Sequence, residues 1–298
     1  GMLTMVSRNM VMKWFDKRRG MANAVLGIFT ALAFSMAPQM LGQIINRFDW
    51  RGAWVMLAIT VGILFAIFVL IVFRDNPQSC GLQPDGRMPV RRKKKRPPSL
   101  PAKDFTLKEA RITLPFWVFT LALALSSLYV TGLTFHIVSI FESSGMTEDK
   151  ALAIFFPTSI IAVTVQFVFS YLSDFVKLKY LLIFFLSGLL ISSFGLFLLS
   201  GKPSAYFIII AGNGIVWGMY SVLIGVTWPR FYGLKHLGAI SGFSLSIAVF
   251  GSAMGPYLFS LSLKYAGSYG IVALFCMILA VVLLLLSVRT DNPGAAAN

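Results

Sequence analysis

Residues 112–141 read ITLPFWVFTLALALSSLYVTGLTFHIVSIF, a run without any Asp, Glu, Lys or Arg. A helix needs only about 20 consecutive apolar residues to cross the hydrocarbon core of a bilayer. Further charge-free runs of this kind occupy 21–46, 52–73, 151–173, 180–201, 203–229, 237–263 and 265–288. The sequence therefore predicts an all-α polytopic membrane protein with about eight complete transmembrane helices.

The composition agrees with this fold class. Hydrophobic residues make up 57% of the chain and charged residues 12%, whereas soluble domains carry about 25% charged residues. The apolar runs are uninterrupted, which excludes the alternating strands of a membrane barrel. The net charge of +15 lies between the spans, so no nucleic-acid partner is expected.

Lys and Arg residues divide unevenly between the connections of these spans. Of the 26, 20 lie in one set of alternate connections and five in the other. Because cytoplasmic loops carry the excess of Lys and Arg, the C-terminus is expected in the cytoplasm, with a bacterial inner membrane as the location. Cys80 lies in a loop and Cys276 in the last span, so neither a disulfide nor a metal site is expected.

The spans form two groups around a polar, proline-rich stretch. We interpret 1–73 as the end of one helical group, 74–111 as a cytoplasmic linker, 112–290 as a six-helix group and 291–298 as a cytoplasmic tail. The linker contains the basic run Arg91–Arg96, which is expected to contact anionic lipid headgroups. A monomer is expected.

An internal repeat relates the two groups. Pro38 lies eighteen residues after Gly20, and Pro256 lies eighteen residues after Gly238. A turn and a new span follow each proline at the same distance. Parallel repeats of this kind occur in secondary transporters. Residues 1–12 are then interpreted as the remainder of a span, with about three and a half helices preceding them.

Seven motifs resemble those of one family: Trp14-Phe15-x-Lys17-Arg18-Arg19-Gly20-x-Ala22, Arg74-Asp75-Asn76-Pro77, Gly81-Leu82-Gln83-Pro84-Asp85-Gly86, Phe135-His136, Gly238-Ala239-Ile240-Ser241-Gly242, Gly251-x-x-x-Gly255-Pro256 and Gly267-Ser268-Tyr269. They are similar to loops and helix ends of the major facilitator superfamily, and within it of bacterial monocarboxylate porters and oxalate/formate antiporters. The resemblance implies the major facilitator fold, with part of the fourth helix and helices five to twelve in this chain.

The chain departs from that resemblance where the family often has charges. The arginine that holds a substrate carboxylate in the eighth helix would fall on Gln166, and the acidic residue one turn earlier would fall on Ala162. The span 237–263 has no central lysine. A dicarboxylate held by two cations within the membrane is therefore disfavoured.

Polar side chains inside the spans are the candidate substrate-binding residues, because polar atoms in hydrocarbon face the bundle interior or a wet cavity. Asn213, Trp217 and Tyr220 share one helical face, which is either a cavity wall or a packed seam with Gly214 and Gly218. The full candidate set is Tyr129, His136, Gln166, Asn213, Trp217 and Tyr220.

His136 is the candidate for proton coupling or substrate contact, since histidine exchanges a proton near neutral pH. Its position near a span end also allows a gate or a capped polar residue. Tyr129 lies seven residues earlier on the same face.

Two further groups are expected to serve the conformational change. The charges of Asp174, Lys177 and Lys179 resemble the family's loop motif that latches the two halves, with a solvated turn as the alternative. Arg18 and Arg19 are further candidates for this conformational gate. Pro38, Gly42, Gly251, Gly255 and Pro256 are the candidate helix pivots, where freed backbone groups are satisfied by neighbouring helices.

The sequence contains no enzyme signature: we find no carboxylate pair, no Ser/His/Asp set and no phosphate loop in a plausible context. The function expected is secondary active transport of a small organic solute, monocarboxylate-like, by alternating access. Proton symport and anion exchange both remain open. The alternatives are a carrier of a neutral solute, a non-transporting sensor or truncated pseudotransporter, and an ion channel.

Overall fold

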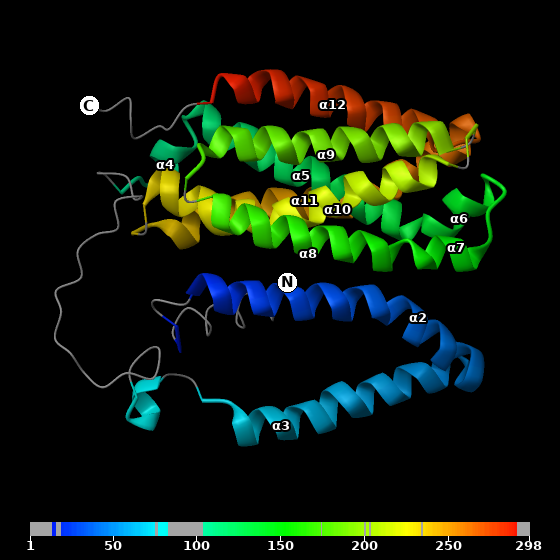
Figure 1. The fold of residues 1–298 in the computed structure, drawn as a ribbon, viewed down its shortest axis with the longest axis horizontal. Coiled ribbons are helices and arrows are strands. Elements are labelled where there is room, and N and C mark those ends of the chain that lie inside the picture. The colour runs from blue at the N-terminus through cyan, green and yellow to red at the C-terminus, as the bar shows by residue number, and fades with distance from the viewer. Residues whose placement is uncertain are drawn as a thin grey trace. The chain divides into compact units, whose positions relative to one another are not determined.

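The computed structural model describes residues 14–15, 19–74, 77–82, 104–173, 175–199, 201–202, 204–233 and 235–290. The chain divides into two units, residues 1–95 and 96–298. Both are built from helices (Figure 1), and the described residues contain no strand.

The first unit is a helical hairpin. Helix α2 (Arg19–Ile59) is interrupted at Asp49, where φ is 62° and ψ is 165°. A π-helical turn, η1 (Thr60–Leu64), leads into α3 (Phe65–Val72), and a short 3-10 helix, η2 (Pro77–Cys80), follows. The break at Asp49 falls between the predicted spans 21–46 and 52–73. The indole Nε1 of Trp14 donates a hydrogen bond of 3.1 Å to the carbonyl of Arg74.

The second unit contains long helices that run back and forth beside one another (Figure 1). Its elements are α4 (Leu107–Ala110), α5 (Leu114–Phe135), α6 (Ile137–Glu142), α7 (Glu148–Ala153), α8 (Phe155–Leu172), α9 (Leu178–Leu199), α10 (Ala205–Tyr232), α11 (Leu237–Ala266) and α12 (Gly270–Val288).

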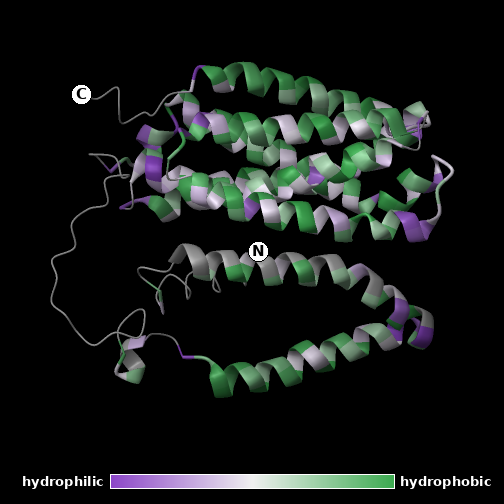
Figure 2. Cartoon of the chain, in the orientation of Figure 1, coloured by the Kyte–Doolittle hydropathy of each residue, from purple (hydrophilic) through white to green (hydrophobic). Residues whose placement is uncertain are grey.

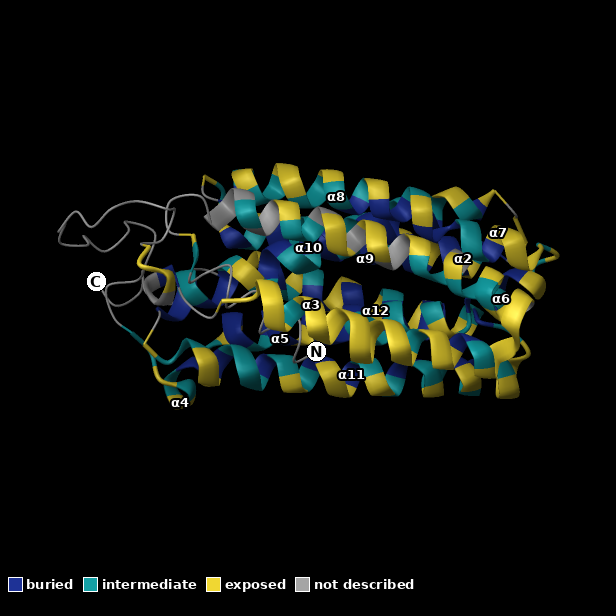
Figure 3. Ribbon diagram, turned by 90° about the horizontal axis from the view of Figure 1, so that it is seen from below, coloured by how far each residue is buried: buried dark blue, intermediate teal, exposed yellow. Residues whose placement is uncertain are grey.

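Seven helical segments of the described residues are long and apolar enough to cross a membrane. Apolar residues cover the long helices of the second unit, and hydrophilic residues gather at their ends (Figure 2). Exposed residues recur along the long helices of the second unit (Figure 3). Many of the exposed side chains are large and apolar, such as Phe250 of α11 and Leu285 of α12. Such a surface suits lipid rather than water. The prediction of an all-α polytopic membrane protein is confirmed.

Two predicted spans are each divided in the structure. The span 112–141 forms α5 and α6, with His136 between them at φ −102° and ψ 10°. The span 151–173 forms α7 and α8, which meet at Ile154. Helix α7 ends at Ala153 because Pro157, four residues later, has no N–H to donate to the Ala153 carbonyl.

Both copies of the internal repeat place a residue of positive φ eleven positions after their proline. Asp49 has φ 62° and Gly267 has φ 64°, and Pro38 and Pro256 lie inside α2 and α11. Glycine adopts a positive φ without steric cost, whereas the backbone angles of Asp49 lie in a region that is essentially reserved for glycine. The two copies therefore turn at the same register with different residues.

The end of the predicted linker packs on the second unit. The N–H of Phe105 donates to the carbonyl of Tyr232 at 2.9 Å, and the hydroxyls of Thr113 and Tyr232 lie 2.7 Å apart. Thr106 and Glu109 form a capping box at the start of α4. Residues 104–113 are thereby fixed against the end of α10.

Helices α5 and α11 touch at their backbones. A Cβ atom at Gly251 would lie 2.5 Å from the carbonyl oxygen of Ala124, and one at Gly255 would overlap the carbonyl oxygen of Leu128. The hydroxyls of Thr131 and Ser252 lie 2.8 Å apart on the same seam. Small residues allow this close approach, which drives helix association in membranes.

Helix α10 makes two similar seams. Gly212 faces the backbone of Ser192 and the carbonyl of Gly188 in α9. Gly214 and Gly218 face α8, where a Cβ atom would lie 3.1 Å from the carbonyl oxygen of Thr158 and 2.5 Å from that of Ala162, respectively. The spacing Gly212-x-Gly214-x-x-x-Gly218 thus serves close packing against two neighbours.

The α5–α11 seam predicts opposite effects for two glycine substitutions in α11. Gly255→Ala is expected to lower the free energy of unfolding in mixed micelles by about 2 kcal/mol, because the new methyl group meets a backbone carbonyl. Gly242→Ala is the matched control, since no atom lies within 4 Å of its added Cβ. It is expected to raise the stability by up to about 1 kcal/mol through helix propensity. Equal stabilities of the two variants would contradict the backbone contact between α5 and α11 at Gly255.

Candidate functional site

The candidate residues of α10 lie on the side that faces α5 and α8. The hydroxyl of Tyr220 lies 3.2 Å from Oγ of Ser127 in α5. The ring of Trp217 stacks on Phe155 of α8, with centroids 6.3 Å apart. Asn213 is 3% exposed. The polar line Asn213, Trp217 and Tyr220, here called the α10 polar line, therefore lies inside the second unit.

Two buried oxygens near this line have no hydrogen-bond partner among the described residues. They are Oδ1 of Asn213 and Oγ1 of Thr158. Gly214, the neighbour of Asn213, packs on the backbone of Thr158, so the two residues lie on adjoining stretches of α10 and α8. A buried polar atom without a partner costs about 1–3 kcal/mol. These oxygens are therefore suited to receive a hydrogen bond from a polar molecule.

Gln166 lies on α8 at the level of the α10 polar line. It comes one turn after Ala162, whose carbonyl contacts Gly218 between Trp217 and Tyr220. Its side chain is half-buried and makes no side-chain hydrogen bond to another described residue. An amide at this position can donate and accept hydrogen bonds.

Tyr129 lies in the core of the second unit. Its side chain is fully buried, and its hydroxyl lies 2.9 Å from Oγ of Ser192 in α9. Its ring lies beside Phe259 of α11, with centroids 6.2 Å apart. Tyr129 thus joins α5, α9 and α11 in the core of the second unit.

His136 lies at the junction of α5 and α6 and contacts two other helices. Its Nε2 is 3.1 Å from the carbonyl oxygen of Pro256 in α11, and its Nδ1 is 3.3 Å from the hydroxyl of Tyr269 before α12. The imidazole stacks on Phe259 at an interplanar angle of 12°. Nine residues separate His136 from Ser127, which at 1.5 Å per residue places them about 13 Å apart along the helix. His136 thus lies apart from the Tyr220 end of the α10 polar line.

The predicted latch is described only in part. Asp174 and Arg18 lie outside the described residues, as does the basic run Arg91–Arg96, and the side chain of Arg19 is not described either. Lys177 is exposed, and Nζ of Lys179 lies 5.8 Å from the ring of Tyr180.

Arg230, which sequence reasoning did not select, ties the loop after α8 to α10. Its guanidinium donates hydrogen bonds to the carbonyls of Ser173 and, at 3.5 Å, of Val176. A cation at the C-terminus of a helix also interacts favourably with the helix dipole. The signal in the sequence was a single Arg directly after Pro229 at the end of an apolar span.

The candidate pivots differ in their surroundings. Gly251 and Gly255 make the α5–α11 seam, and Pro256 lies inside α11 directly after Gly255. In the first unit, no atom lies within 4 Å of a Cβ added at Gly42, and Pro38 lies inside α2.

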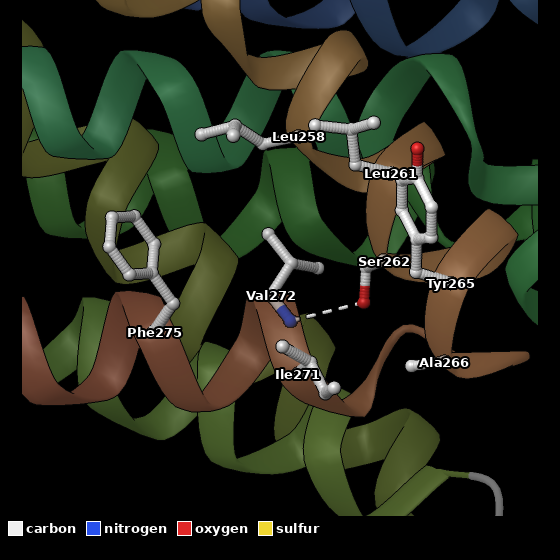
Figure 4. Close-up of a pocket in the computed structure, with 8 residues that line it drawn as sticks. All are labelled: Leu258, Leu261, Ser262, Tyr265, Ala266, Ile271, Val272 and Phe275. Atoms are coloured by element: carbon white, nitrogen blue, oxygen red, sulfur yellow. Dashed lines mark hydrogen bonds between the residues drawn. The ribbon is translucent and has the colours of Figure 1, made fainter.

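A cavity of about 320 Å³ lies between the end of α11 and the start of α12 (Figure 4). Its lining is almost entirely carbon, from residues such as Leu258, Tyr265 and Phe275. Its one buried hydroxyl, Ser262, donates to the carbonyl of Ser268 at 2.7 Å and accepts from the N–H of Val272 at 3.2 Å. This cavity suits an apolar group and does not contain any candidate residue. The described part of the chain contains no group of three or more His, Cys, Asp or Glu residues that could hold a metal ion.

Two comparisons with known proteins bear on this arrangement. The family model described as Major Facilitator Superfamily matches residues 1–256. No curated protein matches the chain. The family match covers most of the chain and agrees with its apolar spanning helices. The chain is an integral, multi-pass membrane protein and belongs to the major facilitator superfamily.

Proposed function

We propose that this protein is a secondary active transporter of a small, monocarboxylate-like organic solute that works by alternating access. Membership of the major facilitator superfamily supports a secondary transporter. The observation that carries the solute site is the α10 polar line, where Oδ1 of Asn213 is buried without a partner among the described residues.

The chemistry of this site favours a solute with few charges. Gln166 and Asn213 offer amide N–H donors, and Tyr220 and Ser127 offer hydroxyls, for a carboxylate or hydroxyl of the solute. The position at which related porters carry an arginine is Gln166, so neutral donors replace the cation. A carrier of a neutral solute is the second candidate for the same reason.

Several features complete the proposal. The C-terminus lies in the cytoplasm of a bacterial cell, and the chain acts as a monomer in the inner membrane. Arg91–Arg96 contact anionic lipid headgroups.

One conformation is latched by the charges of Asp174, Lys177 and Lys179, together with those of Arg18 and Arg19. The helices pivot at Pro38, Gly42, Gly251, Gly255 and Pro256. Arg230 supports the latch, because it holds the loop that contains Asp174.

Uptake of labelled lactate, pyruvate, formate and oxalate into liposomes tests the proposal. A pH jump and an outward gradient of unlabelled solute are applied in separate experiments, so that the effective driving condition separates symport from exchange. Saturable uptake of a monocarboxylate is expected, with a large loss in Gln166→Ala. Thr164→Ala is the matched control on α8, because the Thr164 hydroxyl bonds only to its own helix at Ile160.

Two results would count against this assignment. If a folded and inserted protein takes up none of the four acids, the assignment of a carboxylate solute is wrong. Ligand-dependent stabilisation without uptake would instead favour the sensor.

Asn213→Ala is expected to separate solute binding from stability. The substitution removes a buried oxygen that has no partner among the described residues, so the melting temperature should stay the same or rise. Loss of one hydrogen bond to the solute should raise KM for uptake by about tenfold. Thermal unfolding and uptake kinetics on the same preparation provide the measurement. A fall in melting temperature with unchanged KM would assign Asn213 to packing.

A further inference from the structure

A hydrogen-bonded chain joins four elements at the end of α5. His136 lies between α5 and α6, Ser139 lies in α6, Tyr269 precedes α12, and the carbonyl of Pro256 belongs to α11. Nε2 of His136 is 3.1 Å from the Pro256 oxygen. The Tyr269 hydroxyl lies 3.3 Å from Nδ1 of His136 and 2.9 Å from Oγ of Ser139. Tyr269 is 4% exposed, whereas His136 and Ser139 are half-buried.

The first step concerns the imidazole tautomer. A carbonyl oxygen only accepts hydrogen bonds, so Nε2 of His136 must carry a hydrogen and donate it to Pro256. In the neutral imidazole, Nδ1 is then an acceptor. To receive a hydrogen, Nδ1 needs the Tyr269 hydroxyl as its donor, but that hydroxyl donates to Oγ of Ser139 in the structure. One hydroxyl hydrogen serves only one of these two acceptors.

The second step concerns the protonated imidazole. When Nδ1 gains a hydrogen, it donates to the oxygen of Tyr269, and the Tyr269 hydroxyl donates to Oγ of Ser139. The direction from Tyr269 to Ser139 is the one found in the structure. The imidazolium therefore keeps every hydrogen bond of the chain, whereas the neutral imidazole leaves either Nδ1 or Oγ of Ser139 without the Tyr269 hydrogen.

We propose that His136, Tyr269 and Ser139 form a proton-binding site, in which one proton from water binds to Nδ1 of His136. The N–H bond at Nδ1 forms, and the O–H bond that held the proton in hydronium breaks. The site deepens the proposed function, because it supplies a proton-coupling group, and it rests on that function for its role in transport. Tyr269 and Ser139 are positioning residues.

The positive charge of the protonated imidazole is stabilised by this hydrogen-bonded chain. Tyr269 is the titratable side chain that contacts it; α11 presents the Pro256 carbonyl and the ring of Phe259, and α6 presents Ser139 through Tyr269. No Asp, Glu, Lys or Arg among the described residues forms a hydrogen bond with His136. The Pro256 and Tyr269 oxygens are thus the two acceptors of the imidazolium.

The two histidines of the chain, His136 and His236, make a direct test possible. Nitrogen NMR of the whole chain, labelled with ¹⁵N-histidine in lipid nanodiscs, is recorded across about pH 5 to 8. His236→Gln assigns the signals. His136 is expected as the Nε2–H tautomer at high pH and as imidazolium at low pH. In Tyr269→Phe it should protonate at lower pH, because hydrogen bonds to a charged group are the stronger ones. Ser139→Ala should shift it less in the same direction, and His236 should not move.

Three outcomes would overturn the inference: an Nδ1–H tautomer at high pH, an imidazole that keeps one charge state throughout the range, or a titration that neither variant moves. The wild-type tautomer and titration decide the first two even if a variant fails to fold. The spectra need no solute, so a protein that titrates as expected but transports none of the acids would contradict the proposed function alone. A working carrier with a silent His136 would contradict this inference alone.

Discussion

Backbone contact between helices is the constraint on which the second unit depends. Within a bilayer each helix satisfies its own backbone groups, and association then depends on close packing rather than on exclusion of water. Gly255 meets the Leu128 carbonyl, Gly212 meets Gly188, and Gly218 meets Ala162. These contacts leave no room for a side chain, and they fix the distances between α5 and α11, between α9 and α10, and between α8 and α10.

Fixed seams also fix the polar side chains between them. The glycines of α10 face α8 and α9, while Tyr220 reaches Ser127 of α5 and Trp217 stacks on Phe155 of α8. The α5–α11 seam ends close to Pro256, whose carbonyl meets His136. Buried polar groups are costly in an apolar bundle. His136 lies about 13 Å along α5 from Ser127, the partner of Tyr220, which is consistent with separate contacts for a solute and for a proton.

The sequence predicted the helices well because the bilayer imposes one strong rule on their length and polarity. Run lengths and charges located each long helix of the second unit to within a few residues. They did not locate the break at His136, since the residues on both sides of it are equally apolar. The break at Ile154 was visible in principle through Pro157, four residues after Ala153.

The candidate site was less accessible to sequence reasoning, because hydrogen-bond partners come from distant helices. Helical spacing grouped Asn213, Trp217 and Tyr220, but nothing in it pointed to Ser127, 93 residues away from Tyr220. In the same way Tyr269 and Ser139 were not selected as partners of His136, and Arg230 was not selected as a partner of the loop after α8. Helical spacing also placed Tyr129 on the same face as His136, whereas in the structure the Tyr129 hydroxyl forms a hydrogen bond with Ser192 in the core.

The central claim is that the α10 polar line borders a solute path that opens to each side of the membrane in turn. Alkylation of Ser127→Cys by a membrane-impermeant maleimide tests it most directly, in a background of Cys80→Ser and Cys276→Ala, with exposed Lys150→Cys as the reference for surface labelling. The account predicts that the thiol reacts from either side of the membrane and that a transported acid slows the reaction, while Lys150→Cys is unaffected by the acid. A thiol at position 127 that reacts from neither side, in a protein whose surface thiol labels fully, would contradict it.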